Sequence, residues 1–273
     1  MFTGEFYATF LIVFRESLEA ALVVGIILTV LRRLKQGRYI RWVILSTILA
    51  IVASVLAGAG LMSLAESARG NMEKLIEGVM SLAACAVLTW MIFWMEKQAR
   101  TIKPQIESEV EHVVGRGDRI AMMALPFFAV FREGAETVLF LGAIAMREGG
   151  GLSLSAGLLG FVLAVGLVVV MMALGRKVPL RLLFRSSGLI LLLVAAGLAA
   201  YGIHELQEIN VIPTLIYPVW NINHILNEKE GIGALLKALF GYNGNPSLIE
   251  VLLYIGYLAA MSRLIRSWRK APQ

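Results

Sequence analysis

Six ionisable residues interrupt two otherwise apolar stretches of the chain, each in the order Arg-Glu-x-x-Glu. They are Arg15, Glu16 and Glu19 in FLIVFRESLEAALVVGII (10–27), and Arg132, Glu133 and Glu136 in FFAVFREGAETVLFLGAI (127–144). At about 100° per residue, the three charges of each motif share one stripe of a helix. A charge at the centre of a membrane helix costs about 2.5–3.5 kcal/mol, so six unpartnered charges would cost about 15–20 kcal/mol. We therefore expect the two stripes to face each other, or water, inside a helix bundle.

Cation binding is the chemistry that these residues favour. An i,i+4 ion pair neutralises one glutamate of each motif, and four carboxylates against two guanidiniums leave a formal charge of −2. Carboxylate oxygens are hard ligands suited to Fe, Mn, Mg or Ca rather than to Cu(I) or structural Zn. A divalent ion would neutralise the cluster, whereas a trivalent ion would need a fifth acid. The alternative is that the charges only lock helices together, but buried ion pairs rarely repay their desolvation.

The composition shows which elements position these charges. Of the 273 residues, 58% are hydrophobic and 16% charged, whereas soluble domains carry about a quarter charged residues. The apolar residues come in blocks of about 20, the length that crosses a bilayer. The single cysteine, Cys85, excludes a disulfide framework and a thiolate metal cluster. The net charge of +6 lies in short loops between apolar blocks, which indicates contact with the lipid surface and not nucleic acid.

The sequence predicts an all-α integral membrane protein with seven transmembrane helices in the plasma (inner) membrane. The expected spans are 6–31, 42–64, 75–95, 120–146, 152–174, 182–203 and 248–265. Alternate connections hold 18 of the 25 Lys and Arg residues, five lie on the other side, and two are inside spans. By the positive-inside rule this places the N-terminus outside and the C-terminus inside.

The two motifs also predict an inverted repeat. Their arginines are 117 positions apart and separated by three spans, so the second copy enters the membrane from the opposite side, as in transporters with a site at the repeat interface. We expect one permease domain (1–273) made of repeat one (1–96), repeat two (119–206), an outer loop (207–247) and a seventh helix (248–267). Within that loop, ILNEKEGIGALLKALF (225–240) is either an interfacial amphipathic helix, a plug or a docking loop.

These features resemble the oxidase-dependent iron permease family, which includes fungal high-affinity and bacterial EfeU-type permeases. RESLE (15–19) and REGAE (132–136) match the family's REGLE-like motif, with Ser17 and Gly134–Ala135 as departures off the charged stripe. The segments EGVMSLAACAVLTWMIFWM (77–95), GLAA…HE (197–205) and LFGYNGNPSLIEV (239–251) extend the resemblance over the chain. It implies inward transport of iron (Fe2+ or Fe3+) as substrate, no permanent cofactor, no enzymatic activity, and an extracytoplasmic ferroxidase or iron-binding partner.

We therefore assign candidate roles to ten residues. The expected metal ligands are Glu16, Glu19, Glu133 and Glu136, with Glu77 and Glu205 at the outer mouth, where the resemblance favours them; Arg15 and Arg132 tune the site, and Glu73 and His204 are weaker candidates at the mouth. The alternative for the mouth residues is that they are interfacial charges reaching water. Glu250 is interpreted as a helix N-terminal charge, and Trp90, Phe93 and Trp94 as an interfacial aromatic belt, with Met91 and Met95 facing lipid or packing.

Two other functions remain open. The first is a permease for another cation, such as lead or manganese, because the sequence does not separate these ions from iron. A membrane di-iron oxidase is the second alternative, because paired Glu motifs also build di-iron sites in helix bundles. Those sites use Glu-x-x-His, and no histidine falls in the central half of any predicted span.

Overall fold

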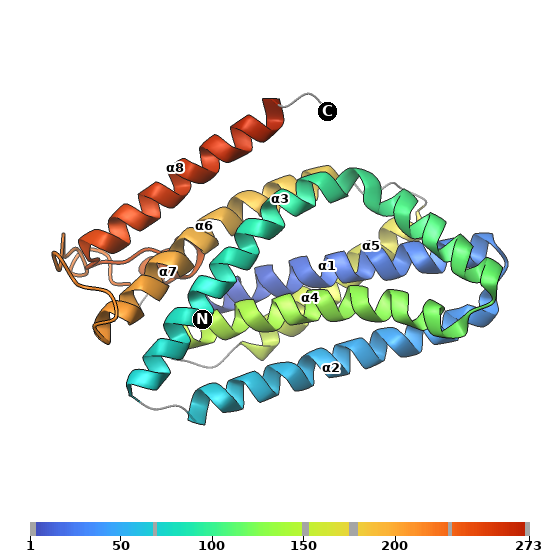
Figure 1. The fold of residues 1–273 in the computed structure, drawn as a ribbon, viewed down its shortest axis with the longest axis horizontal. Coiled ribbons are helices and arrows are strands. Elements are labelled where there is room, and N and C mark those ends of the chain that lie inside the picture. Colours follow the sequence, from blue (N-terminus) through green and yellow to red (C-terminus); the bar gives the residue numbers. More distant parts are fainter. Residues whose placement is uncertain (1–3, 68–69, 149–152, 175–179, 229–230, 271–273) are drawn as a thin grey trace.

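The computed structural model describes residues 4–67, 70–148, 153–174, 180–228 and 231–270, and every long regular element in these ranges is a helix. The helices are α1 (Gly4–Arg33), α2 (Ile40–Ser67), α3 (Asn71–Arg116), α4 (Arg119–Glu148), α5 (Leu154–Ala173), α6 (Leu180–Glu208), α7 (Gly231–Phe240) and α8 (Leu248–Lys270), with a short 3-10 turn η1 (Gly37–Tyr39) before α2. The predicted all-helical class is confirmed for this part of the chain. Each predicted span falls on one of α1–α6 or on α8 (Figure 1).

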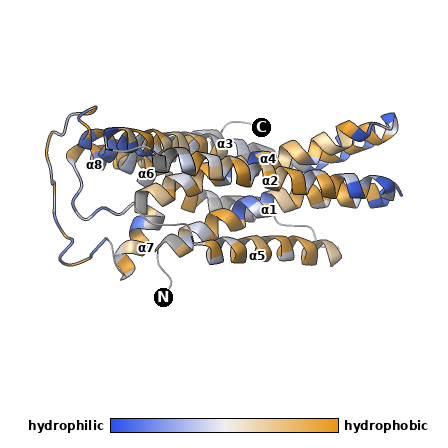
Figure 2. Ribbon diagram, turned by 90° about the horizontal axis from the view of Figure 1, so that it is seen from below, coloured by the Kyte–Doolittle hydropathy of each residue, from blue (hydrophilic) through white to orange (hydrophobic). Residues whose placement is uncertain are grey.

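Five helical segments are long and apolar enough to cross a membrane: Gly37–Ser63, Asn71–Trp94, Leu154–Ala173, Gly188–Glu208 and Leu248–Ser267. Helices α1 and α4 carry three motif charges each in their middle. The count of seven crossings, the inverted repeat and the orientation stay predictions. Hydrophobic residues run along most of α2 and α5 (Figure 2), and many of them are exposed, including Val55 on α2 and Leu158 on α5.

Helices α1 and α4 lie side by side and run in opposite directions through the middle of the bundle (Figure 1). Helix α5 packs along α1, α2 packs along α4, and α3 pairs with α6. Glycines permit the close packing of α5 on α1 and of α2 on α4. A Cβ on Gly134 would lie 2.0 Å from Ser54 Oγ on α2, and a Cβ on Gly160 of α5 would lie 2.8 Å from the carbonyl oxygen of Phe10 on α1.

Helix α3 continues well beyond the membrane segment. The connection between the third and fourth spans was expected to be a loop, and that expectation is wrong for most of its length: α3 has 46 residues and contains Pro104. The extension is held because Val110 and Val113 pack with Ile27 of α1 and Met122 of α4 in one buried cluster. The charged composition of this segment suggests a solvated loop. Packing against α1 and α4 stabilises it as a helix instead.

The segment between α6 and α8 covers one end of the bundle (Figure 1). Of the alternatives left open for 225–240, a helix is present as α7 over the last ten residues, and it contacts α1 and α6. Helix α8 begins with a capping box, in which the Ser247 N–H donates to Glu250 Oε1 at 3.1 Å and the Glu250 N–H donates to Ser247 Oγ at 3.3 Å. The interpretation of Glu250 as a helix N-terminal charge is thus confirmed.

Candidate metal centre

Both Arg-Glu-x-x-Glu motifs lie in the middle of unbroken helices, on the faces where α1 and α4 meet. The four glutamates and Arg15 are buried, with exposed fractions between 1% and 9%. Arg132 differs, because 40% of its side chain is exposed. The predicted burial inside the bundle is therefore found for five of the six charges, and the two arginines occupy different environments.

Each arginine pairs with both glutamates of its own motif. Arg15 contacts Glu16 and its Nη2 lies 2.7 Å from Glu19 Oε1. Arg132 Nε donates to Glu133 Oε1 at 3.1 Å and lies 3.7 Å from Glu136 Oε1. The expected i,i+4 pairs are present, but the expectation of one glutamate per guanidinium is too simple, since each guanidinium is shared by two carboxylates.

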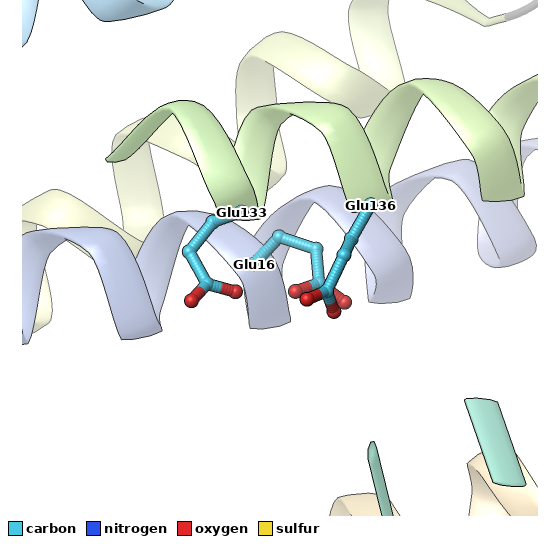
Figure 3. A group of neighbouring side chains, drawn as sticks. All are labelled: Glu16, Glu133 and Glu136. Atoms are coloured by element: carbon cyan, nitrogen blue, oxygen red, sulfur yellow. The ribbon is translucent and has the colours of Figure 1, made fainter. Parts of the chain in front are cut away.

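Three glutamates converge across the interface of the two helices (Figure 3). One oxygen each of Glu16, Glu133 and Glu136 lies within 4.8 Å of the others, and the Oε2 atoms of these three carboxylates are buried without a hydrogen-bond partner. Two oxygens on opposite sides of a cation at metal–oxygen distances of about 2.3–2.6 Å are about 4.6–5.2 Å apart. The geometry therefore suits a hard cation held by three carboxylates, here called the carboxylate cluster.

Glu19 is not a member of the carboxylate cluster. It was expected to converge with the other three glutamates, but its Oε1 is ion-paired with Arg15. Among the residues that the structure describes, the group of closely spaced ligand atoms consists of Glu16, Glu133 and Glu136. The ion pair with Arg15 thus keeps the Glu19 carboxylate from acting as a direct metal ligand in this conformation. Glu19 keeps a role in the charge balance of the site, because it shares the guanidinium that also contacts Glu16.

Helix α3 supplies two contacts to the site that the sequence did not suggest. Arg15 Nη2 donates to Met91 Sδ at 3.2 Å, and Met91 is only 2% exposed. The guanidinium carbon of Arg132 lies 4.2 Å from the centre of the Trp94 ring. Trp90, 56% exposed, faces outward, and the Trp94 ring stacks on it with centroids 6.0 Å apart, so Trp94 has a contact inside the site in addition to its expected neighbour in the aromatic belt. The one usable signal was the i,i+3 spacing of Met91 and Trp94 in the apolar third span.

The predicted mouth residues lie on α3 and α6, far along the chain from the motifs. Tyr201 donates a hydrogen bond to Glu77 Oε2 at 3.1 Å and also hydrogen-bonds Glu205, which is buried. The structure thus joins the two predicted glutamates through one tyrosine hydroxyl. Glu73 is exposed and outside this group.

His204 has two carboxylate partners. Its Nδ1 lies 3.1 Å from Glu250 Oε1 and its Nε2 lies 3.3 Å from Glu208 Oε1. The first contact links α6 to the capping box of α8, and the second lies within α6. A histidine engaged at both ring nitrogens serves first to connect the helices, which makes it a weak candidate for a cation ligand.

A polar cavity of about 280 Å³ opens beside these residues. Tyr201, His204 and Glu205 line it from α6, and Glu228 and Asn243 are among the residues that line it from the segment between α6 and α8. This segment was expected to be an interfacial helix, a plug or a docking loop. Its residues form one wall of a cavity over the end of α6.

Apolar helices of membrane-spanning length thus enclose a cluster of carboxylates with unpartnered oxygens, which is the architecture of a helical membrane protein with an internal cation site. Comparison with known proteins shows the family. The chain belongs to the iron permease FTR1 family, whose model matches residues 6–266.

Individual relatives agree with this assignment. The chain is 32% identical over 254 residues to a protein of Yersinia pestis named ferrous iron permease EfeU, with 92% of this chain and 90% of the relative covered. Proteins of the same name from Escherichia coli O157:H7 and Shigella sonnei are 33% identical over 254 residues, with 92% of both chains covered. No solved structure matches the chain.

Proposed function

We propose that this protein imports iron across the plasma (inner) membrane through the carboxylate cluster formed by Glu16, Glu133 and Glu136. The observation that carries the proposal is the convergence of three buried carboxylates from two antiparallel helices, each with an unpartnered oxygen. The relatives named ferrous iron permease support iron as the transported ion. Iron is cargo here, and the proposal needs no permanent cofactor.

The formal charge of the site supports passage of the ion over permanent capture. Four glutamates and two arginines carry −2 in total, so a divalent ion reaches neutrality inside an apolar bundle. The arginines compete with the ion for the same carboxylates through the ion pairs described above. Such competition keeps binding reversible, which transport requires.

An inverted repeat of α1–α3 and α4–α6 supplies the access to both sides. In such a repeat α1 corresponds to α4, and α2 corresponds to α5. The contact of α1 with α5 therefore corresponds to the contact of α4 with α2, and both are among the most extensive in the bundle. In the proposed orientation the carboxylate cluster lies at the interface of the halves, with the N-terminus outside. The cavity over the end of α6 then faces outward, toward the source of iron.

Glu77 and Glu205 form the outer mouth in this proposal. Their shared contact with Tyr201 and the adjacent polar cavity support a place where iron first meets carboxylates. We further propose that an extracytoplasmic ferroxidase or iron-binding protein delivers the ion at this face, as the resemblance to oxidase-dependent permeases implies.

The site favours transport over the di-iron oxidase alternative. Among the described residues, the carboxylate cluster consists of glutamates alone, whereas di-iron sites of helix bundles add histidine from Glu-x-x-His. Carboxylate chemistry does not by itself separate iron from manganese, so the choice of metal depends on the family.

The function is tested by uptake of radiolabelled iron into proteoliposomes that hold the purified protein. We expect uptake well above that of protein-free liposomes, under anaerobic reducing conditions for Fe2+ and with citrate for Fe3+. Unlabelled Mn2+ and Pb2+ are added as competitors. Uptake of manganese or lead with no uptake of iron would overturn the proposed substrate, and no uptake of any of the three would overturn the transport function.

A further inference from the structure

The two arginines of the site lie on opposite sides of the carboxylate cluster along the bundle axis. In each motif the arginine precedes its glutamates, and α1 and α4 run in opposite directions (Figure 1). Arg15 therefore lies toward the end of the bundle where α1 begins, and Arg132 toward the end where α4 begins. In the proposed orientation these are the outer and the inner side.

Helix α3 contacts both arginines, first the outer one and then, further along the helix, the inner one. Met91 reaches Arg15, and Trp94, three residues further along α3, reaches Arg132. Helix α3 runs in the same direction as α1 (Figure 1), so Met91 lies on the outer side and Trp94 about 4.5 Å further inward, at 1.5 Å per residue. One turn of α3 thus spans the arginines of both repeats.

The two contacts differ in what else holds the guanidinium. Arg15 and Met91 are both almost fully buried, so Arg15 has little room to turn. Arg132 is 40% exposed, and its Nε lies 3.7 Å from Glu136, a longer ion pair than that of Arg15 with Glu19. Arg132 is held by its hydrogen bonds to Glu133, with Nε to Oε1 at 3.1 Å, and by the face of the Trp94 ring, which restrains the guanidinium from the side of α3.

We propose that Trp94 is a positioning residue that holds Arg132 beside the carboxylate cluster, where the arginine competes with the bound ion and promotes its release to the inner side. The proposal rests on the proposed function. Without the ring, only the carboxylates hold the guanidinium, so Arg132 turns more often toward its exposed side and competes less with the ion. The ion then binds more tightly and leaves more slowly.

The test compares Trp94→Ala and Trp94→Phe with the wild-type protein in proteoliposomes, using radiolabelled Fe2+ under anaerobic conditions. Uptake rates are normalised to the protein reconstituted. A cation–π contact contributes about 2- to 30-fold in an equilibrium constant. We expect Trp94→Ala to lower the half-saturation concentration and the maximal rate together, each about 2- to 30-fold, and Trp94→Phe to restore most of both because it keeps an aromatic face.

Trp42→Ala is the matched control. Trp42 lies near the start of α2 under another arginine, with Arg41 Cζ 5.3 Å from its ring, so the same kind of contact is lost away from the carboxylate cluster. We expect its half-saturation concentration to be unchanged.

Three results would overturn the proposal while leaving iron transport standing, provided that the wild-type protein transports iron. The first is an unchanged half-saturation concentration in Trp94→Ala. The second is a higher half-saturation concentration, which would mean that the ring assists binding. The third is a fall of the half-saturation concentration in Trp42→Ala that is as large as the fall in Trp94→Ala. Absence of uptake by the wild-type protein would instead refute the proposed function.

Discussion

The close approach of α4 to α2 makes Gly134 a sensitive position, although it carries no charge. A Cβ at Gly134 would lie 2.0 Å from Ser54 Oγ and 2.5 Å from Ser54 Cβ, while Ser54 Cα would be 3.9 Å away. Ser54 is buried, and its hydroxyl donates to the Ala50 carbonyl at 2.9 Å. Gly134→Ala therefore forces α4 outward or Ser54 out of its rotamer, at a cost of about 1–3 kcal/mol for overpacking.

The displacement has a functional consequence, because Glu133 and Glu136 flank Gly134 on the same helix. Moving α4 moves two of the three carboxylates of the cluster relative to Glu16. We expect Gly134→Ala to lower the unfolding temperature in detergent and also to lower iron uptake per reconstituted molecule. A loss of stability alone would leave uptake per molecule unchanged.

A compensating change sharpens the test. Ser54→Gly removes both clashing atoms and leaves only Cα, at an ordinary contact distance of 3.9 Å. Alone it should cost about 0.5 kcal/mol in helix propensity, and combined with Gly134→Ala it should restore uptake. Gly166→Ala on α5 is the control, since nothing lies within 4 Å of its Cβ position. Wild-type stability and uptake in Gly134→Ala, or a double variant no better than the single one, would refute the packing argument.

Two further predictions concern charges of the permeation path. Glu77→Gln and Glu205→Gln should raise the half-saturation concentration for iron about 5- to 150-fold, the equivalent of about 1–3 kcal/mol for a charge-assisted contact. The maximal rate should fall less. An unchanged half-saturation concentration in both variants would mean that the two glutamates are interfacial charges. Arg15→Lys and Arg132→Lys should impair uptake more than thermal stability, because lysine cannot contact two carboxylates with one planar group. Wild-type uptake kinetics in both lysine variants would remove that role.

The sequence was sufficient to predict the helices and the position of the charges. Apolar blocks of bilayer length mark each predicted span, and the cost of burying charges favours their meeting inside the bundle. The motif spacing also predicts the i,i+4 ion pairs, which the structure contains. These features depend on local periodicity and on the energy of single groups, so they can be read without knowledge of the packing.

Other parts of the site depend on contacts between distant segments. Met91 and Trp94 lie 76 and 38 positions from the arginines they contact, and nothing local separates them from Trp90, which faces outward. The exclusion of Glu19 from the carboxylate cluster depends on how Arg15 divides its contacts. The helical extension of α3 is held by Val110 and neighbouring side chains packed against α1 and α4, and the charged sequence around them conceals it.

The carboxylate cluster is the central claim, and one measurement tests it most directly. Initial rates of iron uptake are determined in proteoliposomes for Glu16→Gln, Glu133→Gln and Glu136→Gln, each normalised to reconstituted protein, with Glu109→Gln on the exposed part of α3 as control. The account predicts that each of the three lowers uptake at limiting iron by about 5- to 150-fold, while the control is unchanged. Wild-type uptake in any two of the three cluster variants would contradict it.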